Sequence, residues 1–82
     1  MERKELIKRI GWNIAYDLKN DSTLVYDEYI EELEVNYADN LDNTEEYIVN
    51  FGDELLFDGL TENEAYWIRE AILTVVEYEL NN

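Results

Sequence analysis

Apolar side chains recur three and four residues apart in four stretches of this 82-residue chain. That spacing places them on one face of an α-helix, where they can be buried against a neighbour. The stretches cover about residues 2 to 18, 26 to 37, 44 to 57 and 62 to 80. Because each apolar stripe needs another to pack against, the pattern predicts an all-α fold, a compact bundle of about four short helices. A chain of this length is expected to form a single domain, residues 1–82.

Local signals mark where two of these helices should begin. Thr61 is a good N-cap, and Glu64 lies at the spacing that completes a capping box. Asn43 and Glu46 form a second such pair, and Gly59 suits the end of the helix that would follow them. The last helix is therefore the most strongly marked element of the chain.

The second stretch leaves an alternative open. Its "TLV", residues 23–25, can form a short strand as well as begin a helix. An α+β fold with a small hairpin around residues 22–42 is therefore the main alternative to the bundle.

The charge of the chain is high and unevenly distributed. Six basic residues face 21 acidic ones, for a net charge of -15, although 46% of the residues are apolar. Residues 1–19 hold five of the basic residues, and Arg69 is the only one in the remainder of the chain. A shortage of Lys and Arg disfavours direct binding to nucleic acid or to an anionic membrane. The expected partner is a basic protein surface.

The acids of the second stretch would repel one another on a helix. Asp27, Glu28, Glu31 and Glu32 form like-charged pairs four residues apart, and each such pair costs a helix about 0.2–0.5 kcal/mol. A charge run is usually no more than a solvated face. Imitation of a nucleic acid is a functional alternative, since carboxylates about 6 Å apart on a helix approach the spacing of phosphates, about one per 3.4 Å of a DNA strand.

Length, net charge and the stretch "DEYIEELEVNYADNLDNTEE" together resemble a loose group of small acidic inhibitors carried by phages and mobile elements, the anti-CRISPR and DNA-mimic anti-restriction proteins. These inhibitors share no diagnostic motif, so the resemblance is one of kind over the whole chain. It implies an inhibitor that occupies the basic DNA- or RNA-binding groove of a defence nuclease. The alternative is an acidic interaction module, antitoxin-like or a regulatory subunit, whose partner does not bind nucleic acid.

The expected contact surface consists of carboxylates with two tyrosines at its edge. The partner-binding residues are predicted to be Asp27, Glu28, Glu31, Glu32, Glu34, Tyr37, Asp39, Asp42, Glu45, Glu46, Tyr47, Asp53, Glu54 and Asp58.

Four further aromatic residues, Trp12, Tyr16, Trp67 and Tyr78, lie off the main apolar stripes. The favoured interpretation for Trp12 and Tyr16 is a second core face covered by the fourth helix. A partner's pocket or a homodimer interface is the alternative for all four.

Catalysis is not expected, because the chain has no His and no Cys, and Ser22 is its one serine. No cofactor is expected either. No segment has the glycine and ligand spacing of a dedicated metal site. The absence of Cys and of a long apolar run suggests a cytoplasmic protein, in the host cytoplasm if a phage encodes it.

Overall fold

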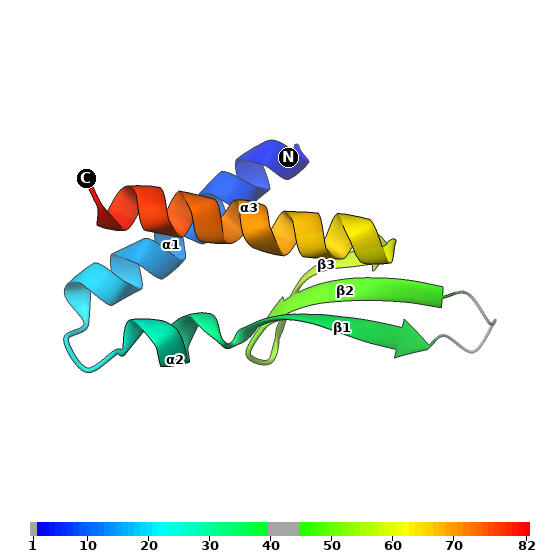
Figure 1. Cartoon of the computed structure of the whole chain (residues 1–82), viewed down its shortest axis with the longest axis horizontal. Coiled ribbons are helices and arrows are strands. Elements are labelled where there is room, and N and C mark those ends of the chain that lie inside the picture. The colour runs from blue at the N-terminus through cyan, green and yellow to red at the C-terminus, as the bar shows by residue number, and fades with distance from the viewer. Residues whose placement is uncertain (1, 40–44) are drawn as a thin grey trace. The chain divides into compact units, whose positions relative to one another are not determined.

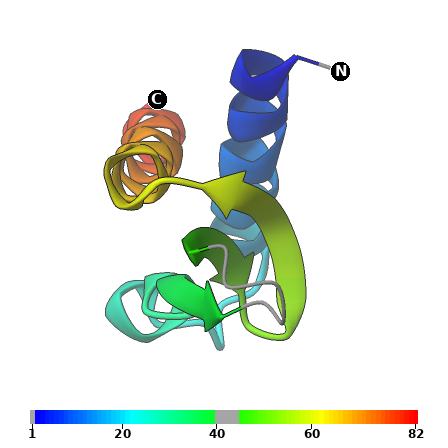
Figure 2. The ribbon, with the colours of Figure 1, turned by 90° about the vertical axis from the view of Figure 1, so that its right-hand side faces the viewer.

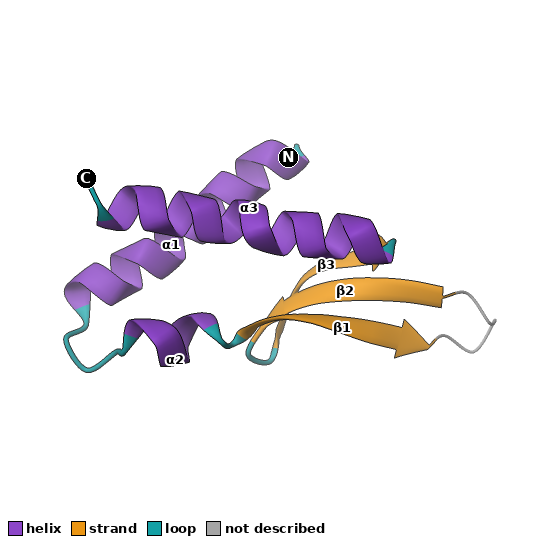
Figure 3. Ribbon diagram, viewed as in Figure 1, coloured by secondary structure: helices purple, strands orange, loops and turns teal. Residues whose placement is uncertain are grey.

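The computed structural model describes residues 2–39 and 45–82, which form helices and a three-stranded sheet (Figures 1 and 3). The fold class is therefore α+β. In chain order the elements are α1 (Arg3–Asn20), α2 (Tyr26–Ile30), β1 (Leu33–Asp39), β2 (Glu45–Phe51), β3 (Glu54–Leu60) and α3 (Glu62–Leu80).

The expected all-α bundle is wrong in the middle of the chain. The helix expected over residues 26–37 ends at Ile30, and residues 44–57 hold β2 and part of β3 in place of a helix. The α+β alternative has the right class, but it placed the hairpin around residues 22–42. The observed pair of strands is β1 and β2, which begins at Leu33 and ends at Phe51. The physical reason is that the polar Glu34 and Asn36 separate Leu33, Val35 and Tyr37, which is the alternation of a strand. β-branched and aromatic side chains such as those of Tyr47 and Val49 also suit a pleated surface.

Contacts divide the chain into two compact units, which are described separately. The first unit contains residues 1–30 and 70–82, and the second contains residues 31–69. Helix α3 contributes its first turns to the second unit and the rest of its length to the first.

The first unit is built on α1 and the C-terminal part of α3. Ile7, Ile14, Ile72 and Val76 are 5% exposed or less and form its core. Helix α1 matches the helix predicted from residue 2 to 18, with two more residues at its end. Helix α2 belongs to the same unit.

Two tyrosines tie α2 to the long helices of the first unit. The Tyr29 hydroxyl donates to a carboxylate oxygen of Asp17 at 2.7 Å, and the Tyr26 hydroxyl donates to Glu77 at 3.3 Å. Between α1 and α2, Asp21 accepts hydrogen bonds from the backbone N–H and the hydroxyl of Thr23. These two bonds lower the pKa of Asp21 below its usual value of 3.8.

The second unit is an antiparallel sheet with strand order β1-β2-β3 and the first turns of α3. Leu33, Val49 and Leu60 are at most 3% exposed, and the strand register places them on one face of the sheet. Ala65 and Ile68 of α3 are completely buried. These residues form the core of the unit.

Irregular pairing bends the third strand. The register between β2 and β3 shifts twice between Tyr47 and Asn50, and Figure 2 shows the strong curvature of β3. Gly52, in the two-residue turn before β3, has a φ of +58° that other residues rarely adopt. Gly59, expected to follow a helix, lies within β3 with a φ of +64°.

The start of α3 confirms the predicted capping box. The Thr61 N–H donates to Oε1 of Glu64 at 3.0 Å, and the Glu64 N–H donates to Oγ1 of Thr61 at 3.2 Å. The side chains of the first turn thus satisfy backbone donors that have no partner within the helix. In the described part of the chain, neither long helix is apolar enough over its length to cross a membrane.

Candidate protein-binding surfaces

The acidic charge is concentrated in the second unit. Residues 31–69 contain twelve acidic residues and one basic residue, whereas the first unit contains nine acidic and five basic residues. The one basic residue of the second unit, Arg69, is half-buried, and its Nε donates to the carbonyl oxygen of Leu33 at 2.9 Å. This arrangement directs the guanidinium toward the backbone of the sheet.

Four exposed carboxylates gather at one end of the sheet, and we call them the acidic turn cluster. Its members are Glu31, Glu32, Asp53 and Glu54. The Gly52 N–H donates to the carbonyl oxygen of Glu32 at 2.9 Å, which holds the start of β1 beside the turn between β2 and β3. Four like charges are therefore presented on two adjacent backbone segments.

The face of the sheet opposite Leu33 and Val49 carries amides and two carboxylates. Glu34 is exposed, while Glu46 is half-buried and accepts the Gly59 N–H at 3.3 Å. Between them, Nδ2 of Asn36 donates to Oδ1 of Asn50 at 2.6 Å. The register offsets Glu34 from Glu46 by four residues, or about 13 Å along the strands.

The predicted row of acids along one helix does not exist. Asp27 and Glu28 are exposed on α2 in the first unit, whereas Glu31 and Glu32 follow that helix in the second unit. Asp39 and Glu45 are paired in the β1–β2 register.

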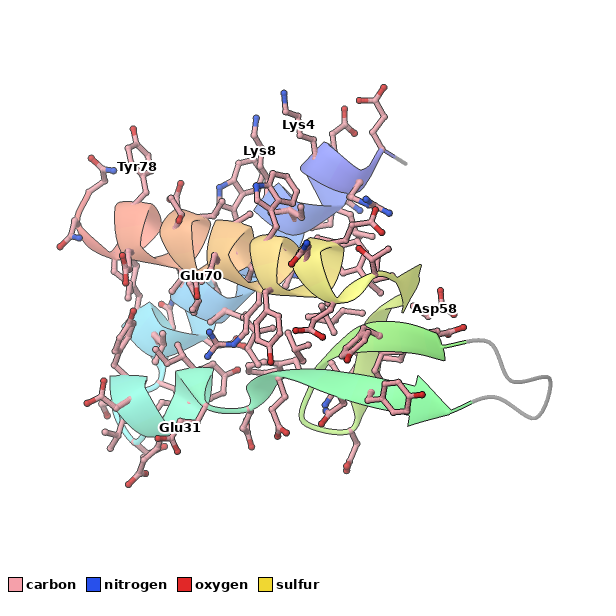
Figure 4. All side chains as sticks on the ribbon, turned by 45° about the vertical axis from the view of Figure 1, so that its right-hand side comes forward. Lys4, Lys8, Glu31, Asp58, Glu70 and Tyr78 are labelled. Carbon is pink, nitrogen blue, oxygen red and sulfur yellow. The ribbon has the colours of Figure 1, made fainter. Side chains whose placement is uncertain are left out.

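Of the remaining predicted carboxylates, the structure describes Asp58 but not Asp42. Asp58 is exposed on β3, toward the opposite end of the sheet from Glu31 (Figure 4). Asp42 lies outside the described residues. The structure therefore brings together only part of the predicted set, principally the acidic turn cluster.

Tyr37 and Tyr47 are directly opposite each other on β1 and β2. Their rings meet edge to face with centroids 5.4 Å apart, and the Tyr47 hydroxyl donates to Glu62 at 2.9 Å. The register places both on the same face of the sheet as Leu33, opposite to Glu34 and Glu46. Tyr37 remains 51% exposed, so it offers aromatic surface on the face of the sheet that carries Leu33, not on the face of Glu34 and Glu46.

The expectation that Trp12 and Tyr16 are core residues is wrong. Trp12 is 52% exposed, Tyr16 is 66% exposed and, on α3, Tyr78 is 67% exposed. Sequence spacing places Trp12 and Tyr16 one turn apart but cannot say how far a neighbouring helix covers them. In the second unit, Trp67 is also 60% exposed.

A groove of about 370 Å³ lies between α1 and α3 in the first unit. We call it the aromatic groove, and it is lined by Lys8, Trp12, Thr74, Val75, Tyr78 and Glu79. Figure 4 shows Lys8 and Tyr78 projecting from these two helices. Trp12 also borders two smaller hollows along α1, one with Arg9 and one with Lys19.

The described residues contain no group of three or more Asp, Glu, His or Cys side chains placed to hold a metal ion. Among the same residues, no buried side-chain polar atom lacks a hydrogen-bond partner.

Comparison with known proteins finds no matching family model, no matching curated protein and no matching solved structure.

Proposed function

We propose that this protein binds the basic nucleic-acid-binding groove of another protein and excludes the nucleic acid from it. The second unit is the part that makes the contact, with the acidic turn cluster at its centre. By the resemblance to small acidic inhibitors, the target is a defence nuclease, either a CRISPR effector or a restriction enzyme.

The observation that carries the proposal is that the second unit exposes carboxylates and has almost no basic residues to pair with them. Its only basic residue hydrogen-bonds to the Leu33 carbonyl. Glu31, Glu32, Asp53 and Glu54 are exposed, and among the residues that the structure describes their carboxylates have no hydrogen bond or ion pair. A carboxylate without an internal partner can accept bidentate hydrogen bonds from an arginine of another protein. Grooves that bind phosphates supply such arginines and lysines.

The spacing of the acids favours charge mimicry over a replica of the duplex. Glu34 and Glu46 are about 13 Å apart along the strands, whereas a DNA strand advances about 3.4 Å per phosphate. A target that binds this surface would therefore contact it with a few arginines or lysines at separate points. The Asn36 and Asn50 amides between the two carboxylates can add hydrogen bonds.

The proposal is tested with purified nucleases and a labelled DNA duplex. The protein is added to a guide-loaded Cas9-type effector and to restriction endonucleases, and both DNA binding and DNA cleavage are measured. Inhibition that excess duplex DNA relieves, with no complex containing DNA and inhibitor together, supports exclusion from the groove. Inhibition that no excess of DNA relieves would show that the protein acts elsewhere on its target.

An interaction module with a non-nucleic-acid-binding partner is the second candidate. The exposed Trp12, Tyr16 and Tyr78 favour it, because exposed aromatic side chains are enriched at binding hot spots. Immobilised protein is used to capture partners, and the captured proteins are challenged with duplex DNA and with free aromatic-groove variants. This second function is supported by a partner that DNA never displaces and whose binding is lost in the Trp12→Ala variant.

A further inference from the structure

The aromatic groove of the first unit is a preformed and mainly apolar surface. Trp12 and Tyr78 line it, and each exposes more than half of its side chain. Thr74 and Val75 of α3 also line it. A groove of this size accepts one or two apolar side chains of a partner.

The charges around the groove favour certain neighbours for the apolar side chain of a partner that enters it. Helix α1 carries five of the six basic residues of the chain. Lys8 and Glu79 both line the groove itself, while Arg9 and Glu5 border one adjoining hollow and Lys19 borders the other, so three basic residues face two acidic ones. The local excess of positive charge favours an apolar anchor that is surrounded by carboxylates.

The second unit of the same chain has a surface with that composition. Leu55 is 54% exposed at the start of β3, directly after Asp53 and Glu54 of the acidic turn cluster. Glu31 and Glu32 lie beside the same turn, through the hydrogen bond from Gly52 to Glu32. Leu55 is thus an exposed apolar residue next to these carboxylates along the chain, and α1, with five basic residues against Glu5 and Asp17, supplies the opposite charge beside the groove.

We propose that the aromatic groove of one copy of this chain binds Leu55 and the acidic turn cluster of a second copy. The contact joins two different surfaces, so it is heterologous and leaves one groove and one cluster free in each pair. It goes beyond the proposed inhibition, since it needs no target. It also predicts that a basic target and a second copy compete for the acidic turn cluster.

The test uses two variants that each lose one side of the contact. The groove variant carries Lys8→Glu and Trp12→Ala, and the cluster variant carries Glu31→Gln, Glu32→Gln, Leu55→Ala and Glu54→Gln. All these side chains are exposed, so both variants should keep the wild-type circular dichroism spectrum. Sedimentation velocity is measured over a concentration series at about 0.15 M salt, where a screening length of about 8 Å weakens the overall repulsion between copies.

The expected result is a sedimentation coefficient that rises with concentration for the wild type. Each variant alone should associate at least about tenfold more weakly, as for the loss of a hot-spot residue. An equimolar mixture of the two variants should recover a one-to-one complex, because one intact groove meets one intact cluster. A wild type that stays monomeric would overturn the proposal, as would a mixture that does not associate or a groove variant that associates like the wild type.

Target inhibition is measured separately and has an independent outcome. Loss of self-association in the groove variant with unchanged inhibition of a nuclease would leave both proposals standing. Self-association without inhibition of any nuclease would contradict the proposed function alone.

Discussion

The backbone of α1 at Gly11 lies against Val75 of α3 so closely that no side chain fits between them. A β-carbon on Gly11 would lie 2.5 Å from Cγ1 and 2.6 Å from Cβ of Val75, and 3.3 Å from the carbonyl oxygen of Ile72. The two helices of the first unit therefore approach each other closely at Gly11. Its residue type is explained by packing, although glycine weakens a helix.

Gly11→Ala should destabilise the protein. Ala is the better helix former by about 1 kcal/mol, but overpacking costs about 1–3 kcal/mol, and the contact with Val75 Cβ can be relieved only by moving the helices apart. Because both contacts with Val75 would be shorter than 3 Å, the overpacking cost should be in the upper part of that range, and we expect a net loss of about 1–2 kcal/mol in urea unfolding. Asn13→Ala, on an exposed position of the same helix, is the matched control and should not destabilise. A Gly11→Ala variant as stable as the wild type would contradict the close packing.

Thr61→Ala should weaken the start of α3. The substitution removes the hydroxyl that accepts the Glu64 N–H, and loss of such a cap costs about 1 kcal/mol. Thr61→Ser keeps the acceptor and should stay within a few tenths of a kcal/mol of the wild type. Hydrogen exchange should show the faster opening at residues 62–65. Equal exchange in the Ala and Ser variants would mean that the cap does not hold this turn.

Tyr26 should make stability fall at alkaline pH. Burial raises the pKa of Tyr26 above its usual 10.0, and the charge of Glu77 and the hydrogen bond to it raise it further, with a smaller effect of Asp27. A raised pKa stabilises the folded state below pH 10, and this contribution is lost as the pH rises through the folded-state value. Urea unfolding from pH 9 to 11.5 should show a steeper loss for the wild type than for Tyr26→Phe. Identical slopes for the two proteins would refute the linkage.

Added salt should stabilise the folded chain. A net charge of -15 with twelve acids in the second unit makes the folded state repel itself, and salt screens that repulsion. Raising NaCl from 10 mM to 300 mM should increase the Tm in thermal melting by a few degrees, which corresponds to about 1 kcal/mol in the free energy of unfolding. A variant with Glu31→Gln, Glu32→Gln, Asp53→Asn and Glu54→Gln should show a smaller rise. A Tm independent of salt in the wild type would show that these charges are not crowded.

The two long helices could be predicted from the sequence because local signals and periodicity agree there. Thr61 and Glu64 mark one helix start, and no strand pattern competes within Glu62–Leu80. The sheet was missed because Leu33, Val35 and Tyr37 satisfy the alternation of a strand while Leu33 and Tyr37 also satisfy helical spacing. The dipeptide Gly52–Asp53 between two apolar segments was the available signal for a hairpin.

The location of the acids was predictable only in part. Carboxylates that have few Lys or Arg residues to pair with are expected on the surface. Glu31, Glu32, Asp53 and Glu54 are exposed, in agreement with that. Their grouping depends on the bond from Gly52 to Glu32, which joins segments about twenty residues apart and leaves no periodic trace in the sequence. The exposure of Trp12 and Tyr78 likewise depends on how far the partner helix reaches.

The central claim is that the second unit displaces nucleic acid from its target, and a comparison of two equally charged variants tests it most directly. The first removes four charges from the acidic turn cluster by Glu31→Gln, Glu32→Gln, Asp53→Asn and Glu54→Gln. The second removes four charges from the first unit by Glu2→Gln, Glu5→Gln, Asp27→Asn and Glu28→Gln.

Each protein is titrated into a complex of fluorescent duplex DNA with a nuclease that is kept from cleaving it, and the anisotropy of the DNA is followed. We predict that the wild type and the first-unit variant release the DNA at similar concentrations, and that the variant without the four charges of the acidic turn cluster needs at least about tenfold more. Equal displacement by the two variants, or wild-type protein bound together with the DNA, would contradict the account.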